Sequence, residues 1–259
     1  MNFTLTHIGT ATLLLEIGSF RLLTDPVFDQ PGGRYSFGYG TSSVKLTSPA
    51  IKMEDIGRVD TVLLSHDHHQ DNLDRAGRTI LPQAKEVITT QAGAKRLGGN
   101  AIGLAAWQSK TLESGDARIK VTAMPARHGS LGSHLIVGET TGFLLEWEGQ
   151  KHGALYISGD TVWFKDLSEI SRRFKVSVAI LHIGRASFPI TGPIRFTANA
   201  SDAVKIVHAL NPRQVIPIHY EGWRHFREPK VEAEKVFASA GISDRVEWIP
   251  LGMPRTIEV

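Results

Sequence analysis

The first 25 residues alternate between apolar and polar positions, with glycines where turns would fall. The segments with this period of two are TLTHIG (residues 4–9), ATLLLEIG (11–18) and FRLLTDP (20–26). Such alternation is typical of half-buried strands, and glycine is common in the turns that join them. We therefore expect the chain to begin with a meander of three antiparallel strands.

The next segment, residues 26–57, has no convincing period. It is rich in Gly, Pro, Ser and Tyr and contains the stretch PGGRYSFGYG. Long irregular connections inside compact domains often serve function, as lids or binding loops. The composition predicts a long loop or lid here.

From residue 59 onward, short aliphatic runs alternate with segments of helical spacing. The aliphatic runs are VDTVLLSH, IKVTAMPARH, ALYISGD, VSVAILH and QVIPIH. Apolar residues three or four positions apart predict helices over residues 161–174, 200–212 and 229–241. Strands and helices are thus mixed along the chain, which indicates an α/β or α+β layered fold.

Composition limits the class of protein. The 259 residues are 41% hydrophobic and 21% charged, which is typical of a folded globular chain, and we expect one domain over residues 1–259. The net charge of +3 comes from scattered Lys and Arg, without a basic arm for nucleic acid. The N-terminus carries neither a signal peptide pattern nor an apolar run long enough for a membrane, so we expect a cytoplasmic protein.

Most of the aliphatic runs end on residues that can bind a metal. The candidates in or just after these positions are His66, His68, His69, Asp71, His128, Asp160, His182 and His219. Because the chain has no cysteine, any metal must be held by imidazole and carboxylate groups. Three histidines and a carboxylate at one strand exit would be costly to bury without a partner, so the cluster predicts a metal site. The remaining histidines are expected to be structural, and they include His7, His134, His152, His208 and His225.

The same segments resemble a known family. The matching stretches are THIGTATLLLEIGSFRLLTDPVF (6–28), LLSHDHHQDNLD (63–74), MPARH (124–128), YISGDT (156–161) and VIPIHYEGW (215–223). They resemble the metallo-β-lactamase superfamily, whose signature is HxHxDH followed by a later His, a bridging Asp and a last His. The chain is similar in particular to the branch of ascorbate-6-phosphate lactonase and N-acyl-phosphatidylethanolamine phospholipase D. The resemblance implies a four-layer αββα sandwich with two metal ions at one edge.

The resemblance also implies a role for each ligand. His66, His68 and His128 would bind the first metal, Asp160 would bridge, and His219 would bind the second metal.

The spacing of the first motif is one residue out of step with this pattern. Anchored at its left end, the motif has Gln70 in place of the Asp and Asp71 in place of the His. Anchored at its right end, it keeps Asp71 as the Asp, makes His69 the second His and puts Asn72 at the last His. Asp71 is a ligand position either way, His69 and Asn72 are alternative ligands, and one imidazole is lost. We expect two divalent ions, with zinc first and with manganese or iron as alternatives for an oxygen-richer second site.

Three further residues belong to the predicted site. Asp25 follows an apolar strand and could accept the free ring N–H of a ligand histidine. His182 and Arg185 lie in a strand-end loop that lines the pocket in the similar branch, and we expect them to contact substrate.

These features predict a metal-dependent hydrolase. A metal-activated water would attack the substrate, with Asp71 orienting the nucleophile or carrying its proton. We expect a small, anionic substrate, with a lactone or ester ahead of a phosphodiester of a phospholipid, nucleotide or nucleic acid. The lack of a basic cluster disfavours nucleic acid and the lack of an amphipathic anchor disfavours a membrane partner. A homo-oligomer and a non-catalytic binder of metal or ligand remain alternatives.

Overall fold

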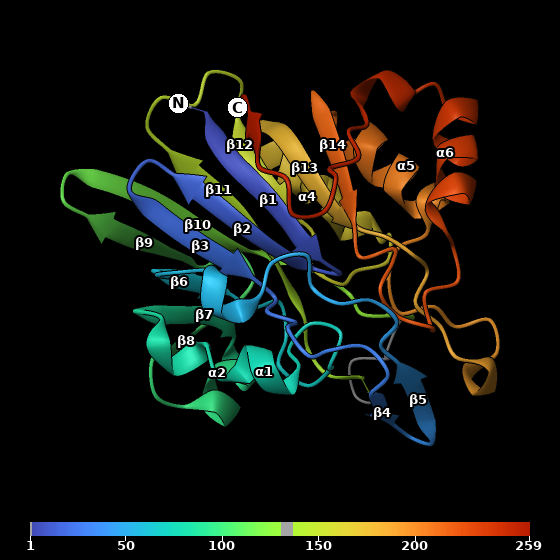
Figure 1. Cartoon of the computed structure of the whole chain (residues 1–259). Coiled ribbons are helices and arrows are strands. Elements are labelled where there is room, and N and C mark those ends of the chain that lie inside the picture. The colour runs from blue at the N-terminus through green and yellow to red at the C-terminus, as the bar shows by residue number, and fades with distance from the viewer. Residues whose placement is uncertain (1, 131–136) are drawn as a thin grey trace.

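Two β-sheets lie face to face at the centre of the computed structural model, which describes residues 2–130 and 137–259 (Figure 1). The seven-stranded sheet contains, in spatial order, β15 (Arg255–Ile257), β1 (Phe3–Gly9), β2 (Thr12–Ile17), β3 (Phe20–Thr24), β6 (Thr61–Leu63), β7 (Glu86–Thr90) and β8 (Ala101–Leu104). The six-stranded sheet contains β14 (Gln214–Ile218), β13 (Val176–His182), β12 (Ala154–Ile157), β11 (Thr141–Trp147), β10 (Ala117–Pro125) and β9 (Ser109–Ser114).

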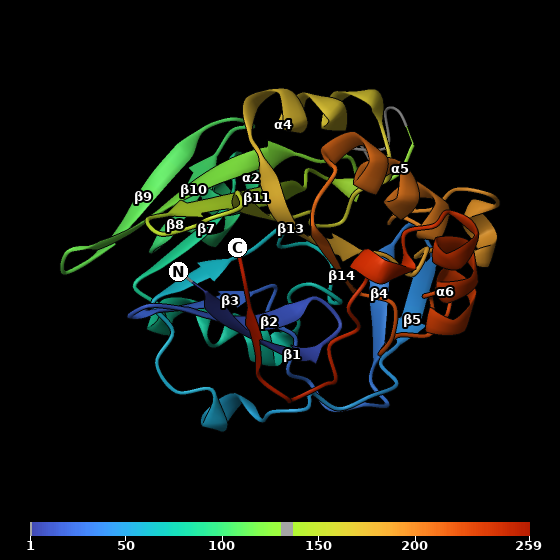
Figure 2. The ribbon, with the colours of Figure 1, turned by 90° about the horizontal axis from the view of Figure 1, so that it is seen from above.

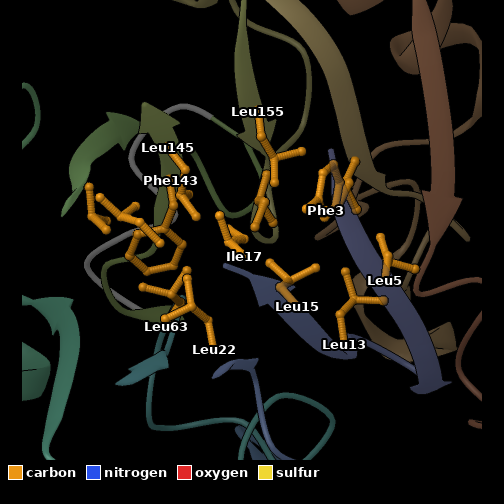
Figure 3. Packing of buried hydrophobic residues seen from close by; sticks show 14 of the residues in the cluster. Phe3, Leu5, Leu13, Leu15, Ile17, Leu22, Leu63, Phe143, Leu145 and Leu155 are labelled. Atoms are coloured by element: carbon orange, nitrogen blue, oxygen red, sulfur yellow. The ribbon is translucent and has the colours of Figure 1, made fainter. Parts of the chain in front are cut away.

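The main hydrophobic core fills the space between these sheets. Figure 3 shows Phe143 and Leu145 of one sheet and Leu15 and Leu22 of the other within this cluster. These side chains are at most 1% exposed. Burying one such side chain contributes about 1.5–3 kcal/mol, so the packed sheets form a rigid support for whatever their edges carry.

Helices cover the outer faces of both sheets (Figure 2). On the seven-stranded sheet these are α1 (Arg75–Arg78) and α2 (Gln91–Leu97), and on the six-stranded sheet they are α4 (Ser168–Arg173), α5 (Ala200–Leu210) and α6 (Lys230–Ser239). Short 3-10 turns are η1 (Met53–Asp55), η2 (Leu81–Gln83), η3 (Lys165–Leu167), η4 (Pro189–Thr191) and η5 (Ser243–Arg245). The architecture is the predicted four-layer αββα sandwich. Of the helices in the two described ranges, none has the length and apolar character needed to cross a bilayer.

Most of the predicted elements are confirmed, and one differs for a physical reason. The N-terminal meander forms β1, β2 and β3, and α5 begins at an Asn199 cap and ends at Asn211 in the left-handed region with φ +46°. The helix predicted over residues 161–174 begins only at Lys165. The residues before it stay extended because Thr161 Oγ accepts from the Arg127 N–H at 3.0 Å, and the Val162 N–H donates to the Arg127 carbonyl at 2.9 Å.

The segment predicted as a long loop contains a two-stranded hairpin of β4 (Arg34–Gly38) and β5 (Thr41–Val44). The hairpin stands apart from both sheets, near the segments that follow β13 and β14 (Figure 1). Long-range contacts hold it there, since Lys45 forms a β-bridge with Trp223 and its Nζ lies 3.4 Å from Asp74 Oδ2. Because these contacts join residues that are distant in sequence, a local hydrophobic pattern could not predict the hairpin.

Strand direction brings the candidate residues to one edge of the sandwich. β3 and β6 are parallel neighbours in one sheet, and β12, β13 and β14 are parallel neighbours in the other. The carboxyl ends of parallel strands lie at the same edge of a sheet, where ligands commonly bind. The Thr141 N–H donates to the Ser65 carbonyl at 3.1 Å and links the two sheets at this edge.

Candidate metal centre

Three imidazoles meet at this edge, and we call them the imidazole group. His66 and His69 follow β6, and His128 follows β10. His69 Nδ1 lies 3.1 Å from His66 Nε2 and 2.9 Å from His128 Nε2. Nitrogen ligands around one tetrahedral zinc ion are roughly 3.3 Å apart when each Zn–N bond is about 2.0–2.1 Å, so this spacing suits a shared cation.

Neighbouring groups fix how these rings face. The Nδ1–H of His128 donates to the Phe196 carbonyl at 2.7 Å, which leaves the lone pair of Nε2 facing the group. Ser65 Oγ lies 2.9 Å from His66 Nδ1 and orients that ring in the same way. Burial lowers the pKa of all three imidazoles, so each is a neutral nitrogen donor near neutral pH.

The second cluster, which we call the carboxylate group, contains Asp71, Asp160 and His219. His219 Nε2 lies 3.6 Å from Asp71 Oδ2 and 3.6 Å from Asp160 Oδ1. Burial opposes ionisation of both carboxyls, but the facing histidines hold the pKa of each below its usual range. Although burial lowers it, the two carboxylates raise the pKa of His219 to about 9, which means that this pocket stabilises a positive charge.

The residues present fit two divalent cations. In the carboxylate group, Asp71 Oδ1 and both ring nitrogens of His219 are buried and have no hydrogen-bond partner within the described ranges. Such atoms are costly to bury unless a further partner binds them. Three neutral nitrogens suit zinc, and two carboxylates with one imidazole make an oxygen-richer site that also suits manganese or iron.

The structure separates the two adjacent histidines that the motif left undecided. His69 belongs to the imidazole group, whereas His68 Nε2 contacts the Val137 carbonyl and its Nδ1 lies 3.6 Å from Asp67 Oδ1. Asn72 contacts the residue that orients His66, because its Nδ2 donates to Ser65 Oγ at 3.3 Å. The right-anchored motif therefore matches the geometry at His69 and Asp71 but not at Asn72, and His68 and Asn72 fall outside both groups.

Asp25 supports the strand end instead of a ligand ring. Its Oδ1 accepts from the backbone N–H of Ser65 at 2.7 Å, and burial raises the pKa of Asp25 to about 8. The reason is its place at the end of β3, directly beside the parallel strand β6. Asp25 thus holds the backbone next to His66.

The two predicted substrate contacts lie away from the cavity. His182 is fully buried, and its Nδ1 lies 2.9 Å from Asp160 Oδ1, so it sits behind the carboxylate group. The Arg185 side chain is exposed, and its charge acts on Glu228. His182 therefore orients Asp160, and Arg185, whose own backbone is left-handed with φ +53°, has an exposed side chain.

One histidine that the sequence assigned to a structural role belongs to the site. His225 Nε2 lies 3.0 Å from Asp71 Oδ2. Its only signal in the sequence is its position six residues after His219, in the loop that follows the same strand. The other histidines expected to be structural lie elsewhere: His7 is buried near the Thr10 carbonyl, His152 lies near Glu258, His208 is exposed on α5, and His134 is outside the described residues.

A cavity of about 600 Å³ opens onto both groups. His69 and His128 of the imidazole group and Asp71 of the carboxylate group form part of its wall. Most of the rest is apolar, from Phe37, Tyr39, Val137, Ala186, Phe188, Ile190, Ile194 and Phe196. No Lys or Arg is among the lining residues that the structure describes.

Comparisons with known proteins agree with this geometry. The family model described as "Beta-lactamase superfamily domain" matches residues 20–220. A "UPF0173 metal-dependent hydrolase" from Opitutus terrae is 32% identical over 238 residues, which cover 89% of this chain and 88% of the relative.

Solved structures share the fold. An isothiocyanate hydrolase from Delia radicum gut bacteria has a TM-score of 0.81 at 21% identity and covers 99% of this chain and 100% of that one. A diiron β-hydroxylase from Streptomyces venezuelae has a TM-score of 0.69 at 18% identity, over 99% of this chain and 54% of that one. With the sandwich, the two ligand groups and these matches together, the chain belongs to the β-lactamase superfamily and, within it, to the UPF0173 metal-dependent hydrolases.

Proposed function

We propose that this metal-dependent hydrolase cleaves a small, largely apolar ester or lactone at a centre of two metal ions. The observation that carries the proposal is the cavity, which brings an apolar wall directly to His69, His128 and Asp71. Its volume of about 600 Å³ suits a small molecule. The sequence favoured an anionic substrate, but a lining in which no described residue is Lys or Arg supports a neutral one.

We propose that the imidazole group holds one ion and the carboxylate group the other, with zinc as the first choice and manganese or iron as alternatives. Bound divalent ions supply an activated water at neutral pH and polarise the carbonyl of the substrate. Asp160 is the proposed bridging carboxylate, because its charge acts on His66 and His128 of one group as well as on His219 of the other.

The side chains of the cavity would hold the substrate. Phe188 and Phe196 pack against each other with ring centroids 6.0 Å apart, and Phe196 also packs against the His128 ring at 5.8 Å. An acyl or alkoxy group lying on these rings would be shielded from water and directed at the ligand groups. Asp71 lines the cavity and could orient the nucleophile or take its proton.

A second candidate is a phosphodiesterase that acts on a phospholipid. The observation in its favour is the apolar rim of the cavity, where Tyr39 is 73% exposed and Ile190 is 72% exposed. Against it stands the lack of cationic side chains among the described residues of the lining, since phosphate is usually bound by Arg or Lys.

The test combines elemental analysis with a substrate panel. Purified protein, as isolated and after addition of Zn²⁺ or Mn²⁺, is assayed on aryl esters of increasing acyl length, a γ-lactone, an aralkyl isothiocyanate and bis(4-nitrophenyl) phosphate. We expect close to two ions per chain and the highest kcat/KM on apolar esters or lactones. Preference for the phosphodiester, with vesicle binding, would favour the second candidate, and metal binding without any turnover would favour a non-catalytic binder.

The first variant to test is Asp160→Asn, with His208→Gln on the exposed face of α5 as its control. Removing the proposed bridging charge should lower kcat/KM at least about a hundredfold, more than residues behind a ligand usually cost. The control should match the wild type. Wild-type turnover in a folded Asp160→Asn protein would rule out the two-metal scheme.

A further inference from the structure

His225 joins the carboxylate group to the β4–β5 hairpin. Its Nε2 lies 3.0 Å from Asp71 Oδ2, and its Nδ1 lies 2.7 Å from Ser43 Oγ on β5. The two bonds use both ring nitrogens and reach residues 154 and 182 positions away in the chain. A single ring thus connects three segments that are far apart in sequence.

Aromatic side chains fix the plane of this ring. Phe188 stacks on His225 with ring centroids 5.1 Å apart and an interplanar angle of 7°. Phe37 of the hairpin lies 4.8 Å away and Phe226 lies 4.7 Å away. Because the His225 side chain is only 3% exposed, the ring cannot turn without losing both hydrogen bonds and this packing.

The bond from His225 fixes the orientation of the Asp71 carboxylate. Oδ2 has the His225 partner and lies 3.6 Å from His219 Nε2, whereas Oδ1 is buried and has no hydrogen-bond partner within the described ranges. When a ring N–H binds one oxygen of a carboxylate, the other oxygen points in a defined direction. Residues behind metal ligands commonly orient those ligands in this way. Asn72, which follows Asp71, cannot do this, because its Nδ2 is engaged with Ser65.

We propose that His225 is a positioning residue that fixes the orientation of the Asp71 carboxylate in the carboxylate group and couples this orientation to the hairpin through Ser43. The inference rests on the proposed function, because it takes Asp71 to be a metal ligand. The hairpin also supplies Phe37 and Tyr39 to the cavity wall, so the same element would contact the substrate and holds the ring of His225, which also lines the cavity. Displacement of the hairpin would loosen the second metal site.

The matched pair His225→Gln and His225→Asn tests which nitrogen matters. A glutamine amide reaches roughly the position of Nε2 and keeps a donor for Asp71, whereas an asparagine amide reaches roughly the position of Nδ1 and keeps only the bond to Ser43. We expect Asn to weaken the second of two Mn²⁺ or Zn²⁺ binding events by about 10- to 100-fold and to lower kcat by a similar factor. Gln should retain most of both, and KM should change less than kcat.

Two controls separate this inference from the proposed function. The first ion should bind with wild-type affinity in both variants, and His208→Gln should match the wild type throughout. If the wild type binds two ions and hydrolyses esters but Asn equals or exceeds Gln, the positioning role is wrong and the proposed function stands. If the wild type binds no second ion, both fall.

Ser43→Ala covers the case in which both His225 variants fail to fold. It removes the hydroxyl behind Nδ1 and leaves the ring stacked on Phe188 and in contact with Phe37. We expect a loss of about tenfold or less in affinity for the second ion, with the first unchanged. Unchanged affinity for the second ion in this variant would overturn the coupling to the hairpin.

Discussion

The imidazole group and the carboxylate group lie at the same edge of the sandwich but are built differently. In the imidazole group, the rings of His66 and His128 are oriented by a hydroxyl and by a backbone carbonyl. In the carboxylate group, each acid is held by a further histidine, at 2.9 Å for Asp160 and His182 and at 3.0 Å for Asp71 and His225. The supporting atoms are uncharged oxygens in one group and imidazole nitrogens in the other.

Charge explains this difference. Neutral imidazoles can be buried together at modest cost, because none of them has to be ionised. Two buried carboxylates need hydrogen-bond donors and a nearby positive charge, since an unpaired buried ion costs several kcal/mol. The carboxylate group is therefore the part of the site that most needs a cation.

The largest contrast is expected between two neighbours, His69 and His68. His69→Ala removes a nitrogen donor from the imidazole group and should lower kcat/KM at least about a hundredfold, while His68→Ala should cost less than about tenfold. The physical reason is that His69 Nδ1 lies within 3.1 Å of two other imidazole nitrogens, whereas His68 contacts the Val137 carbonyl. Steady-state assays and elemental analysis of both variants measure the difference.

Circular dichroism and thermal melting should show that both alanine variants remain folded. Equal losses in the two variants, or a larger loss for His68→Ala, would mean that the loop rearranges when metal binds and that the left-anchored motif describes the working enzyme.

The sequence alone could not decide between these two histidines. The strand rhythm predicted a layered fold with ligand-type residues at strand ends, and the family resemblance implied the four-layer sandwich and the roles of His66, His128, Asp160 and His219. The choice between His68 and His69 depends on a tight turn in which the Leu73 N–H donates to the His69 carbonyl at 2.9 Å. A one-residue insertion can be absorbed anywhere in such a turn, so spacing alone left the choice open.

His225 and the hairpin were missed for a related reason. Both are defined by contacts between distant segments, namely Ser43 with His225 and Lys45 with Trp223. Neither contact produces a repeating apolar pattern in the local sequence. By its position after a strand, Arg185 looked as suitable for the site as His225, although its side chain points outward. Tertiary packing therefore decided the residues around the ligands, while local pattern decided the strands that carry them.

A second contrast lies in how pH affects binding of the two ions. Binding at the carboxylate group would displace a proton from His219, whose pKa is raised to about 9, while burial lowers the pKa of all three residues of the imidazole group, so that they have little proton to release near neutral pH. Between pH 8.5 and 6.5 we expect affinity for the second ion to fall by roughly a hundredfold, and affinity for the first to change far less. Calorimetric titration in buffers of different ionisation enthalpy should show release of about one proton for the second ion only.

The raised pKa of His219 also determines how the stability of the metal-free protein changes with pH. Because the folded pKa of His219 lies above the unfolded value of 6.5, its contribution is fully present below pH 6.5 and is lost as pH rises through about 9. Metal replaces the proton, so the melting temperature of the metal-loaded protein should not fall over this range. Equal pH profiles for both ions would contradict the assignment of charge to the two groups.

The smallest expected effect comes from Ser65→Ala, which tests the local support of the imidazole group. The change removes the hydroxyl that lies 2.9 Å from His66 Nδ1 and that accepts from Asn72 Nδ2 at 3.3 Å, and this hydroxyl makes no hydrogen bond to Asp71, Asp160 or His219 among the described residues. Affinity for the first ion should fall about tenfold, as is usual for residues behind a metal ligand, and affinity for the second should not change. Ser177→Ala on β13, where the buried hydroxyl has no partner among the described residues, controls for removal of a buried serine. Since Ser43→Ala is expected to act on the second ion alone, a Ser65→Ala protein that loses both ions equally would show that the two groups are one cooperative unit.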